Sequence, residues 1–241
     1  MLDKIIKPHS IDWPTKFKEK LEATQDSALL QYYKSGLPSI VTPIDQVVFL
    51  AMDFETTGLD SNDDDIITIG TVPFTIDRIM INKAKHWTVK PRKQLPEESV
   101  VIHGITHSDI LDAPDLSGVY REVLEQMAGK VMVVHYQRIE REFFDKALKT
   151  RINEGIEFPV IDTMQLEAIA QQKMTSGLIN RLKRRQPESV RLGASRSRYG
   201  LPLYPPHHAL TDAVATAELL QAQIAHPVSY THLTLPTNRE V

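Results

Sequence analysis

The most informative segment spans residues 47–58 and reads Val47-Val48-Phe49-Leu50-Ala51-Met52-Asp53-Phe54-Glu55-Thr56-Thr57-Gly58. Its first half is short, apolar and rich in β-branched and aromatic residues, and a glycine follows, which predicts a buried β-strand. Because alternate side chains of a strand point to the same face, we expect Asp53 and Glu55 to project together while Phe54 points into the core.

Two neighbouring carboxylates at the end of a buried strand repel each other and lose hydration. A divalent cation would relieve that repulsion, and a set of oxygen ligands suits Mg²⁺ or Mn²⁺. The pair alone does not decide the matter, because Asp-x-Glu at a strand end is also typical of two solvated charges beside a turn.

Composition limits the class of protein. The 241 residues allow one substantial domain with a short extension, and no stretch reaches the length of a membrane span. The N-terminus lacks the apolar core of a signal peptide, and the absence of cysteine excludes disulfides, thiolate metal sites and cysteine nucleophiles. We therefore expect a cytoplasmic protein with no membrane partner. Since the formal net charge is −3, binding of nucleic acid would require a local concentration of positive charge.

The chain divides into three parts. Residues 1–45 are interpreted as an N-terminal extension with one helix from Thr15 to Tyr33, ended by Gly36 and Pro38. A helix that packs on the main domain is favoured over an arm that binds a protein partner. Residues 46–225 form the main domain. Residues 226–241 are rich in Ser, Thr and Pro and resemble translated sequencing-adapter read-through, so we expect a non-native or disordered tail.

Strands come first in the main domain and then alternate with helices, which predicts an α/β fold with a mixed sheet and helices on its faces. The acidic run from Asp60 to Asp65 is interpreted as a solvated hairpin turn. The expected strands are residues 47–54, 66–76, 86–89, 131–134 and 160–161, and the expected helices are residues 115–127, 140–150, 164–171 and 208–224.

Five further polar positions follow from this interpretation. Asp212 adjoins the apolar stripe of the last helix, and His207 precedes the first turn of that helix. Glu140 begins a helix just after the strand at residues 131–134, where an acidic residue is also favoured by the helix N-terminus alone. Asp162 and Thr163 are expected to cap the helix that follows them.

Taken together, these segments resemble the DEDDh family of 3′→5′ exonucleases, over roughly residues 45–225. The stretch Asp53-Phe54-Glu55-Thr56-Thr57-Gly58 is similar to the first motif of the family. His207-x-Ala209-Leu210-x-Asp212-Ala213 is similar to the third, and Val101-Ile102-His103-Gly104-Ile105-Thr106 to a segment between them. The resemblance implies a ribonuclease H-like mixed sheet flanked by helices.

The second motif departs from the family pattern, which is His-Asn-x-x-Phe-Asp. The aligned residues are His135, Tyr136, Ile139 and Glu140, so the expected aspartate is replaced by a side chain one methylene longer. Asp145 is an alternative, but it lies five residues further along the helix. The departure bears on metal affinity and rate more than on the class of reaction.

The resemblance implies a mechanism. It assigns Asp53, Glu55, Glu140 and Asp212 to two divalent ions, Mg²⁺ or Mn²⁺, and His207 to the general base, with nucleoside 5′-monophosphates as products. The terminal nucleotide would lie among Met52, Thr56, Thr57, Gly58 and Leu59. His103 would lie at the rim of this pocket, although a loop histidine that caps or packs explains it equally well.

The implied substrate is a single-stranded 3′ end, with DNA favoured over RNA. A basic run opposed only by Glu188 offers a phosphate-tracking surface, and three tyrosines, Tyr136, Tyr199 and Tyr204, are open as stacking partners. The run contains Arg181, Lys183, Arg184, Arg185, Arg191, Arg196 and Arg198. Two alternatives remain: a catalytically weak nucleic-acid-binding module that keeps the fold, and an adaptor that holds a partner through its N-terminal extension.

Overall fold

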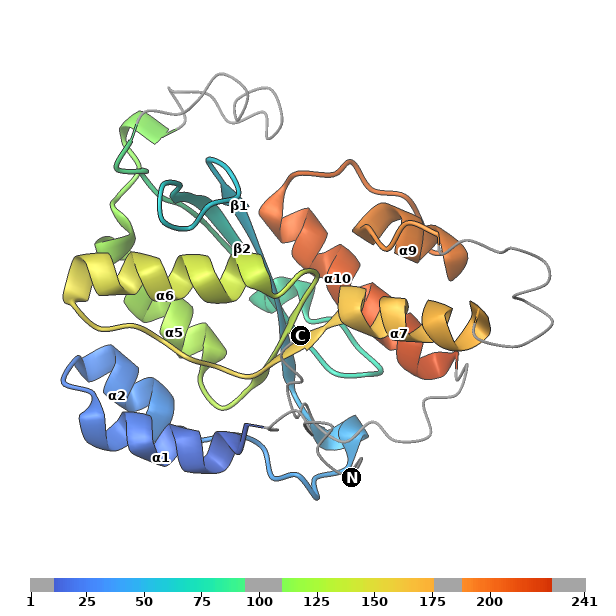
Figure 1. Ribbon diagram of the computed structural model, residues 1–241, viewed down its shortest axis with the longest axis horizontal. Helices are drawn as coiled ribbons and strands as arrows, with labels where there is room; N and C mark the ends of the chain where they lie inside the picture. Colours follow the sequence, from blue (N-terminus) through green and yellow to red (C-terminus); the bar gives the residue numbers. More distant parts are fainter. Residues whose placement is uncertain (1–10, 94–109, 176–187, 227–241) are drawn as a thin grey trace, which may run out of the picture.

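The structure is a computed structural model that describes residues 11–93, 110–175 and 188–226 (Figure 1). His103, the basic residues from Arg181 to Arg185 and the tail after His226 lie outside the described residues. In the described part, no helix is long and apolar enough to cross a lipid bilayer.

The core of the molecule is a five-stranded mixed sheet with the strand order β3-β2-β1-β4-β5. β1 and β2 pair antiparallel, as do β2 and β3, whereas β1–β4 and β4–β5 pair parallel. The mixed sheet expected from the order of elements is confirmed. The strands are β1 (Phe49–Thr56), β2 (Ile66–Phe74), β3 (Lys85–Thr88), β4 (Val131–Val134) and β5 (Val160–Asp162).

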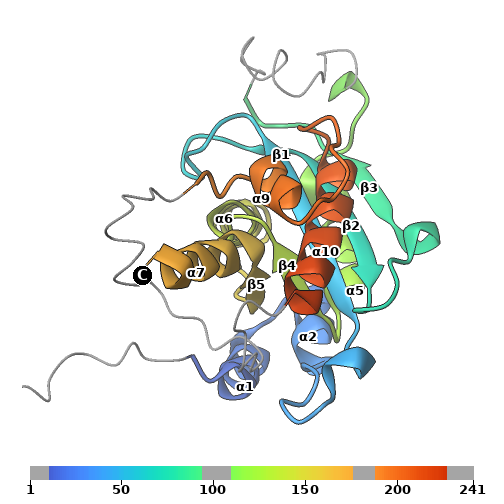
Figure 2. The ribbon, with the colours of Figure 1, turned by 90° about the vertical axis from the view of Figure 1, so that its right-hand side faces the viewer.

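Helices cover both faces of the sheet. Figure 1 shows α5 (Tyr120–Met127) and α6 (Arg138–Ile152) to the left of the sheet and α10 (Ala209–Ala225) to its right. Figure 2 shows α10 in front of the strands, with α7 (Thr163–Thr175) and α9 (Leu192–Arg198) beside it.

Alternate residues of β1 belong to two separate cores. Leu50, Met52 and Phe54 pack with the core that contains α5 and α6. Phe49 and Ala51 pack with the core that contains α10. Because the side-chain period of a strand is two, Asp53 and Glu55 continue the α10 face, as the sequence predicts.

The N-terminal segment differs from the single helix expected between Thr15 and Tyr33. It forms two helices, α1 (Trp13–Ala23) and α2 (Ser27–Lys34). The break occurs because Asp26 caps a new helix, accepting hydrogen bonds from the backbone N–H groups of Ala28 and Leu29 at 2.9 and 3.0 Å. Glu154, after α6, accepts from the backbone N–H groups of Gln25 and Asp26 and so holds the break in place.

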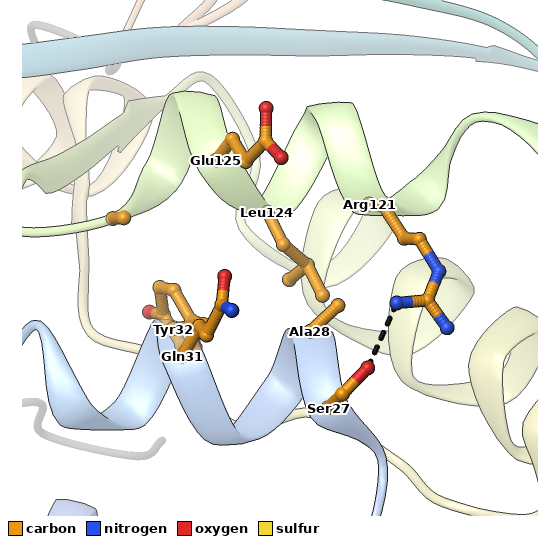
Figure 3. Close-up of a pocket in the computed structure, with 8 residues that line it drawn as sticks. Ser27, Ala28, Gln31, Tyr32, Arg121, Leu124 and Glu125 are labelled. Atoms are coloured by element: carbon orange, nitrogen blue, oxygen red, sulfur yellow. Dashed lines mark hydrogen bonds between the residues drawn. The ribbon is translucent and has the colours of Figure 1, made fainter.

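Both N-terminal helices pack on the α5 and α6 side of the sheet, in one core with those helices. Figure 3 shows α2 and α5 side by side around a pocket of about 230 Å³, where Arg121 donates a hydrogen bond to Ser27. The division of the chain at residue 45 stays a prediction.

The other expected elements lie close to their predicted positions, whereas α9 is a helix that the sequence did not predict. The helix expected from residue 115 begins at Tyr120, because Asp115 first caps the 3₁₀ turn Leu116–Gly118 through the Ser117 N–H at 2.8 Å. The acidic run forms the expected turn between β1 and β2, but it is not wholly solvated. Asp65 is buried and pairs with Arg92, with 2.8 Å between the carboxylate and the guanidinium Nη2.

Candidate active site

The first turn of α10 lies directly on β2. Gly70 pairs with Asp53 of β1 on one side and with His86 of β3 on the other, so these three residues form one row across the sheet. A Cβ atom at Gly70 would lie 2.3 Å from the backbone of Ala209 and Leu210. Because glycine has no side chain, the start of α10 fits into the space between Asp53 and His86.

Three carboxylates meet at this contact. Asp53 and Glu55 come from the end of β1 and Asp212 from the first turn of α10, and one oxygen atom of each lies within 4.8 Å of the others. Burial raises the pKa of Asp53, and the charges of Glu140, Glu55 and Asp212 raise it further. Burial also raises the pKa of Asp212, against the hydrogen bond from the His207 backbone. The pair expected from β1 is thus joined by the carboxylate expected from the last helix.

Glu140 lies close to this cluster but is not one of its three members. It occupies the first turn of α6, is only 2% exposed, and its Oε2 atom has no hydrogen-bond partner among the described residues. Burial raises its pKa, as do the charges of Asp162 and Glu55, while a hydrogen bond from the Phe54 backbone acts in the opposite direction. Asp145, the alternative, instead pairs with Lys149 at 2.6 Å.

His207 lies at a strained position beside the cluster. Its backbone has φ 68°, a left-handed conformation, and its N–H donates a hydrogen bond of 2.9 Å to Asp212 Oδ2. The side chain is exposed at the surface. Asp212 therefore fixes the backbone that carries His207, in addition to its place among the carboxylates.

Sequence reasoning missed His86. Its ring stacks on that of His208, with 5.0 Å between the ring centroids and 12° between the planes. Burial and the neighbouring His208 lower the pKa of His86, and the charge of Glu55 acts in the opposite direction. No local pattern signals this residue, because only the register of β1, β2 and β3 places it next to the site.

The loop after β1 is held by its own polar groups. Thr56 donates to the Gly58 carbonyl at 2.6 Å, and Thr57 donates to Asp64 at 3.0 Å. Leu59 is 76% exposed at the surface. Met52 is fully buried in the core on the α5 and α6 side, so its side chain is directed away from the face that carries the carboxylates.

Asp162 connects the second motif to the sheet. Its carboxylate accepts from the Met164 N–H at 2.9 Å, which confirms the expected cap of α7. It also accepts from the backbone N–H groups of Tyr136 and Gln137 at 3.1 and 3.0 Å. Tyr136 has φ 92°, so this carboxylate holds a strained turn just before Glu140.

The basic run does not form the expected surface at two of its described members. Arg196 is buried and bonds to Ala215 O and Glu218 at 2.6 and 2.7 Å. Arg198 pairs with the buried Glu167 at 2.8 Å as well as with Glu188. The expectation that Glu188 alone opposes the run is wrong, because sequence proximity does not reveal acidic partners on other helices.

Two of the three tyrosines considered for stacking are also engaged. The hydroxyl of Tyr199 donates to Glu167 at 3.1 Å, and that of Tyr204 donates to Glu218 at 3.0 Å. Arg196 lies over the ring of Tyr204, 4.6 Å from its centroid. Tyr136 is 40% exposed.

The chain is similar to proteins named as DNA polymerase III subunit epsilon or as epsilon-like. It is 31% identical over 182 residues to the DNA polymerase III subunit epsilon-like protein of Rhodobacter capsulatus, an alignment that covers 73% of this chain and 24% of that protein. It is 29% identical over 182 residues to the DNA polymerase III subunit epsilon of Treponema pallidum, covering 76% of this chain and 79% of that one. The chain thus spans about a quarter of the length of the first relative and most of the second.

Solved structures share the fold. The nuclease domain of 3′hExo, described as a DEDDh family member bound to rAMP, superposes with a TM-score of 0.58 at 15% identity, covering 76% of this chain and 94% of that domain. Residues 50–220 match the family RNase_T, described as exonuclease. With the carboxylates and the ribonuclease H-like sheet in place, the chain belongs to the RNase_T exonuclease family.

Proposed function

We propose that this protein is a metal-dependent 3′→5′ exonuclease that shortens single-stranded nucleic acid from its 3′ end, with DNA preferred to RNA. The observation that carries the proposal is the convergence of Asp53, Glu55 and Asp212 within 4.8 Å, with the buried Glu140 beside them. Membership of an exonuclease family supports the class of reaction. The preference for DNA is supported by the similarity to polymerase subunits.

The donor set fits divalent metal ions. All the groups are carboxylates, the ligand type that Mg²⁺ and Mn²⁺ prefer. No ion pair from a lysine or arginine to Asp53, Asp212 or Glu140 is found among the described residues. The raised pKa values of these groups and the unpartnered Oε2 of Glu140 fit a site that a bound cation would stabilise.

The four carboxylates would hold two ions between β1, α6 and α10. Divalent ions bound there would lower the pKa of a water molecule and stabilise charge on the departing 3′-oxygen. The four carboxylates come from three separate elements, β1, α6 and α10, so the ligands are positioned by the sheet and by two helix starts and not by a loop.

His207 would accept the proton of the attacking water. A neutral imidazole nitrogen can accept a proton, and this side chain is exposed on a backbone that Asp212 holds in place. Attack at the last phosphodiester breaks the bond between phosphorus and the 3′-oxygen of the preceding nucleotide. The product is a nucleoside 5′-monophosphate, and the shortened strand ends in a new 3′-hydroxyl.

The terminal nucleotide would lie against the loop after β1. Thr56, Thr57 and Gly58 offer backbone groups there, and the exposed Leu59 offers an apolar surface for a base. Met52 would contribute only through its backbone, because its side chain is buried on the other face. His103 stays a prediction for the rim of this pocket.

The test is degradation of 5′-labelled single-stranded DNA and RNA with Mg²⁺, with Mn²⁺ and with EDTA. We expect a metal-dependent ladder of shortening products, faster on DNA, that is abolished by His207→Ala and by Asp53→Ala. Glu19→Gln on the exposed surface of α1 is the matched control and should degrade at the wild-type rate. Degradation at the wild-type rate by both His207→Ala and Asp53→Ala would contradict the proposal.

One observation favours a second candidate, a nucleic-acid-binding module with weak catalysis. Glu140 replaces the aspartate of the family motif and is not one of the three carboxylates that lie within 4.8 Å of each other. In that case the protein binds single strands tightly in EDTA but shows little metal-dependent turnover. Measuring binding and cleavage on the same oligonucleotide separates the two candidates.

A further inference from the structure

Tyr136 carries one of only two exposed phenylalanine, tyrosine or tryptophan rings in the described part of the chain. Its ring is 40% exposed, and that of Tyr204 is 36% exposed. Arg196 lies over the Tyr204 ring, and the Tyr204 hydroxyl donates to Glu218. Among the described residues, no guanidinium or ammonium group lies over the ring of Tyr136. Tyr136 therefore offers the more accessible of the two ring faces.

The backbone of Tyr136 is held in an unfavourable conformation. Its φ of 92° lies in a region that residues with a side chain rarely adopt. The Asp162 carboxylate accepts from the Tyr136 N–H at 3.1 Å, and the Tyr136 carbonyl accepts from the Ile139 N–H at 3.2 Å. Strained residues of this kind persist only where the surrounding structure fixes them, and they cluster at ligand sites. The turn therefore holds the backbone under the ring in one place.

This turn lies at the same edge of the sheet as the carboxylates. β4 pairs parallel with β1, with Val133 opposite Ala51, so the two strands end side by side, about 4.8 Å apart. Asp53 follows Ala51 by two residues, and Tyr136 follows Val133 by three. Glu140, in the first turn of α6, lies four residues after Tyr136. Tyr136 therefore connects the strand that ends beside Asp53 to the helix that carries Glu140.

The side chain of Tyr136 lies near the loop after β1. A hydrogen bond with Glu142 raises the pKa of Arg138, and a hydrogen bond with the Tyr136 hydroxyl raises it further. Hydrogen bonds from Asn62 lower the pKa of Asp60, and the charge of Arg138 lowers it further. Arg138 is therefore close both to the Tyr136 hydroxyl and to the loop that is proposed above for the terminal nucleotide.

We propose that the ring of Tyr136 stacks on a base of the bound single strand, at one of its last three nucleotides. Stacking on an aromatic ring tolerates every base, so this contact would strengthen binding of single-stranded ends without reading their sequence. Tyr136 stands where the motif of the family has asparagine, which tolerates positive φ better. The tyrosine keeps a strain that asparagine would relieve, and a gain in substrate binding explains why.

This assignment rests on the proposed exonuclease function, because it names a contact between the same site and its substrate. The ring contributes to binding of the strand and not to the chemical step. Binding measured without metal therefore tests the contact separately from the reaction.

Three variants separate the ring from the fold. Tyr136→Asn removes the ring and suits the backbone, whereas Tyr136→Phe keeps the ring and removes only the hydroxyl. Ile40→Asn is the matched control, since it removes an apolar side chain that is 78% exposed in the segment before β1.

Dissociation constants are measured in EDTA for 5′-labelled single strands of about 8 nucleotides, within the usual size of a single-strand site. The strands are either intact or lack one base at the first, second or third position from the 3′ end. The rate of shortening with Mg²⁺ is measured on the same strands, and urea unfolding gives the stability of each variant.

We expect Tyr136→Asn to bind the intact strand about tenfold more weakly, a loss within the range for stacking on one base, without becoming less stable in urea. The wild-type protein should lose a similar factor when the base is missing at one of the three positions. Tyr136→Asn should lose nothing further at that position, because the ring and the base are the two partners of one contact. Tyr136→Phe and Ile40→Asn should bind within about threefold of the wild type, less than the loss of a stacked base.

Two results would overturn the stacking contact: unchanged binding by Tyr136→Asn, or losses from the variant and from each missing base that simply add. Equal losses in Tyr136→Phe and Tyr136→Asn would also overturn it, because the hydroxyl and not the ring would then make the contact. If the wild-type protein shortens no strand with Mg²⁺ but the binding pattern holds, the exonuclease proposal fails and the stacking contact stands.

Discussion

His86 on the edge strand β3 stacks on His208, the residue that caps α10, with 5.0 Å between the ring centroids. His208 is the neighbour of His207, and Asp212 lies one turn further on. The stacked rings therefore connect β3, at the edge of the sheet, to the turn that carries His207, the proposed base. They lie on the opposite side of α10 from Asp53.

We predict that His86→Ala lowers kcat by about tenfold and changes KM little, because small losses of alignment at a reacting group are costly while the substrate contacts remain. His86→Phe keeps a flat ring for the stack and should restore most of the rate. His226→Ala, at the far end of α10, is the control. A rate that stays low in the Phe variant would show that the imidazole itself is needed and not its stacking.

Gly70→Ala tests the close approach of α10 to β2. A Cβ atom there would lie 2.3 Å from the backbone of Ala209, so the start of α10 must move. Overpacking of this kind costs about 1–3 kcal/mol of unfolding free energy, and we expect that loss together with weaker metal binding, since Asp212 moves with the helix. Gly193→Ala, where nothing lies within 4 Å of the new atom, should be neutral or slightly stabilising in the same urea titration. Unchanged stability of Gly70→Ala would mean that the helix is not held at this point.

The contrast between Asp53 and His86 shows how much of the site the sequence contains. The pairing of Asp53 with Glu55 follows from the period of two along one strand, and the place of Asp212 follows from a helix start, so local patterns are sufficient for both. What brings Asp212 to Asp53 is Gly70 on the neighbouring strand β2, and His86 is placed there by the register of β3, one strand further. Local patterns do not encode that register.

Arg196 illustrates a different limit. Its charge predicts a solvated or phosphate-binding side chain, whereas the structure buries it against the carbonyls of Ala215 and Pro202 and the carboxylate of Glu218. Burial of a guanidinium is possible only when several acceptors surround it, and here they come from α10 and from the loop before it. The break between α1 and α2 was missed for a related reason, since Glu154 supports it from 128 residues away.

Metal ions should stabilise the protein most at higher pH. Burial and mutual repulsion raise the pKa values of Asp53, Asp212 and Glu140 above those of the unfolded chain. In metal-free protein the folded state therefore holds more protons than the unfolded state above about pH 4, and stability falls as pH rises toward the folded pKa values. Bound metal removes that cost and adds about 2.7 kcal/mol of unfolding free energy at one hundred times its Kd.

We expect Tm measured with EDTA to fall from pH 5 to pH 8 and Mg²⁺ to restore it, with both effects reduced in Asp53→Asn. A Tm at pH 8 that does not change when Mg²⁺ is added would contradict a metal site.

We expect the backbone conformation of Tyr136 to lower the free energy of unfolding. Its φ of 92° is unfavourable for a residue with a side chain, and asparagine tolerates positive φ better than tyrosine. We predict that Tyr136→Asn raises the free energy of unfolding by roughly 0.5–1 kcal/mol, because the side chain is 40% exposed and loses little packing. Asn153→Ala is the reverse experiment, since it puts a less tolerant residue at φ 58° and should lower stability by a similar amount. Destabilisation by Tyr136→Asn in urea unfolding would show that the ring makes contacts that outweigh the strain.

Glu140 gives the sharpest separation between stability and activity. Its carboxylate is buried, has a raised pKa, and carries an oxygen without a hydrogen-bond partner among the described residues. Glu140→Gln removes one of the repelling charges, so we expect the metal-free protein to become more stable by about 1 kcal/mol while kcat falls about a hundredfold or more, since a metal ligand is lost. Glu140→Asp keeps the charge, matches the family motif and should retain measurable activity, with a lower Mg²⁺ requirement if the shorter side chain suits the metal better. The measurements are urea unfolding in EDTA and the rate of strand shortening as a function of Mg²⁺ concentration. If Glu140→Gln degrades strands at the wild-type rate, Glu140 is not a ligand and the site is completed by another group.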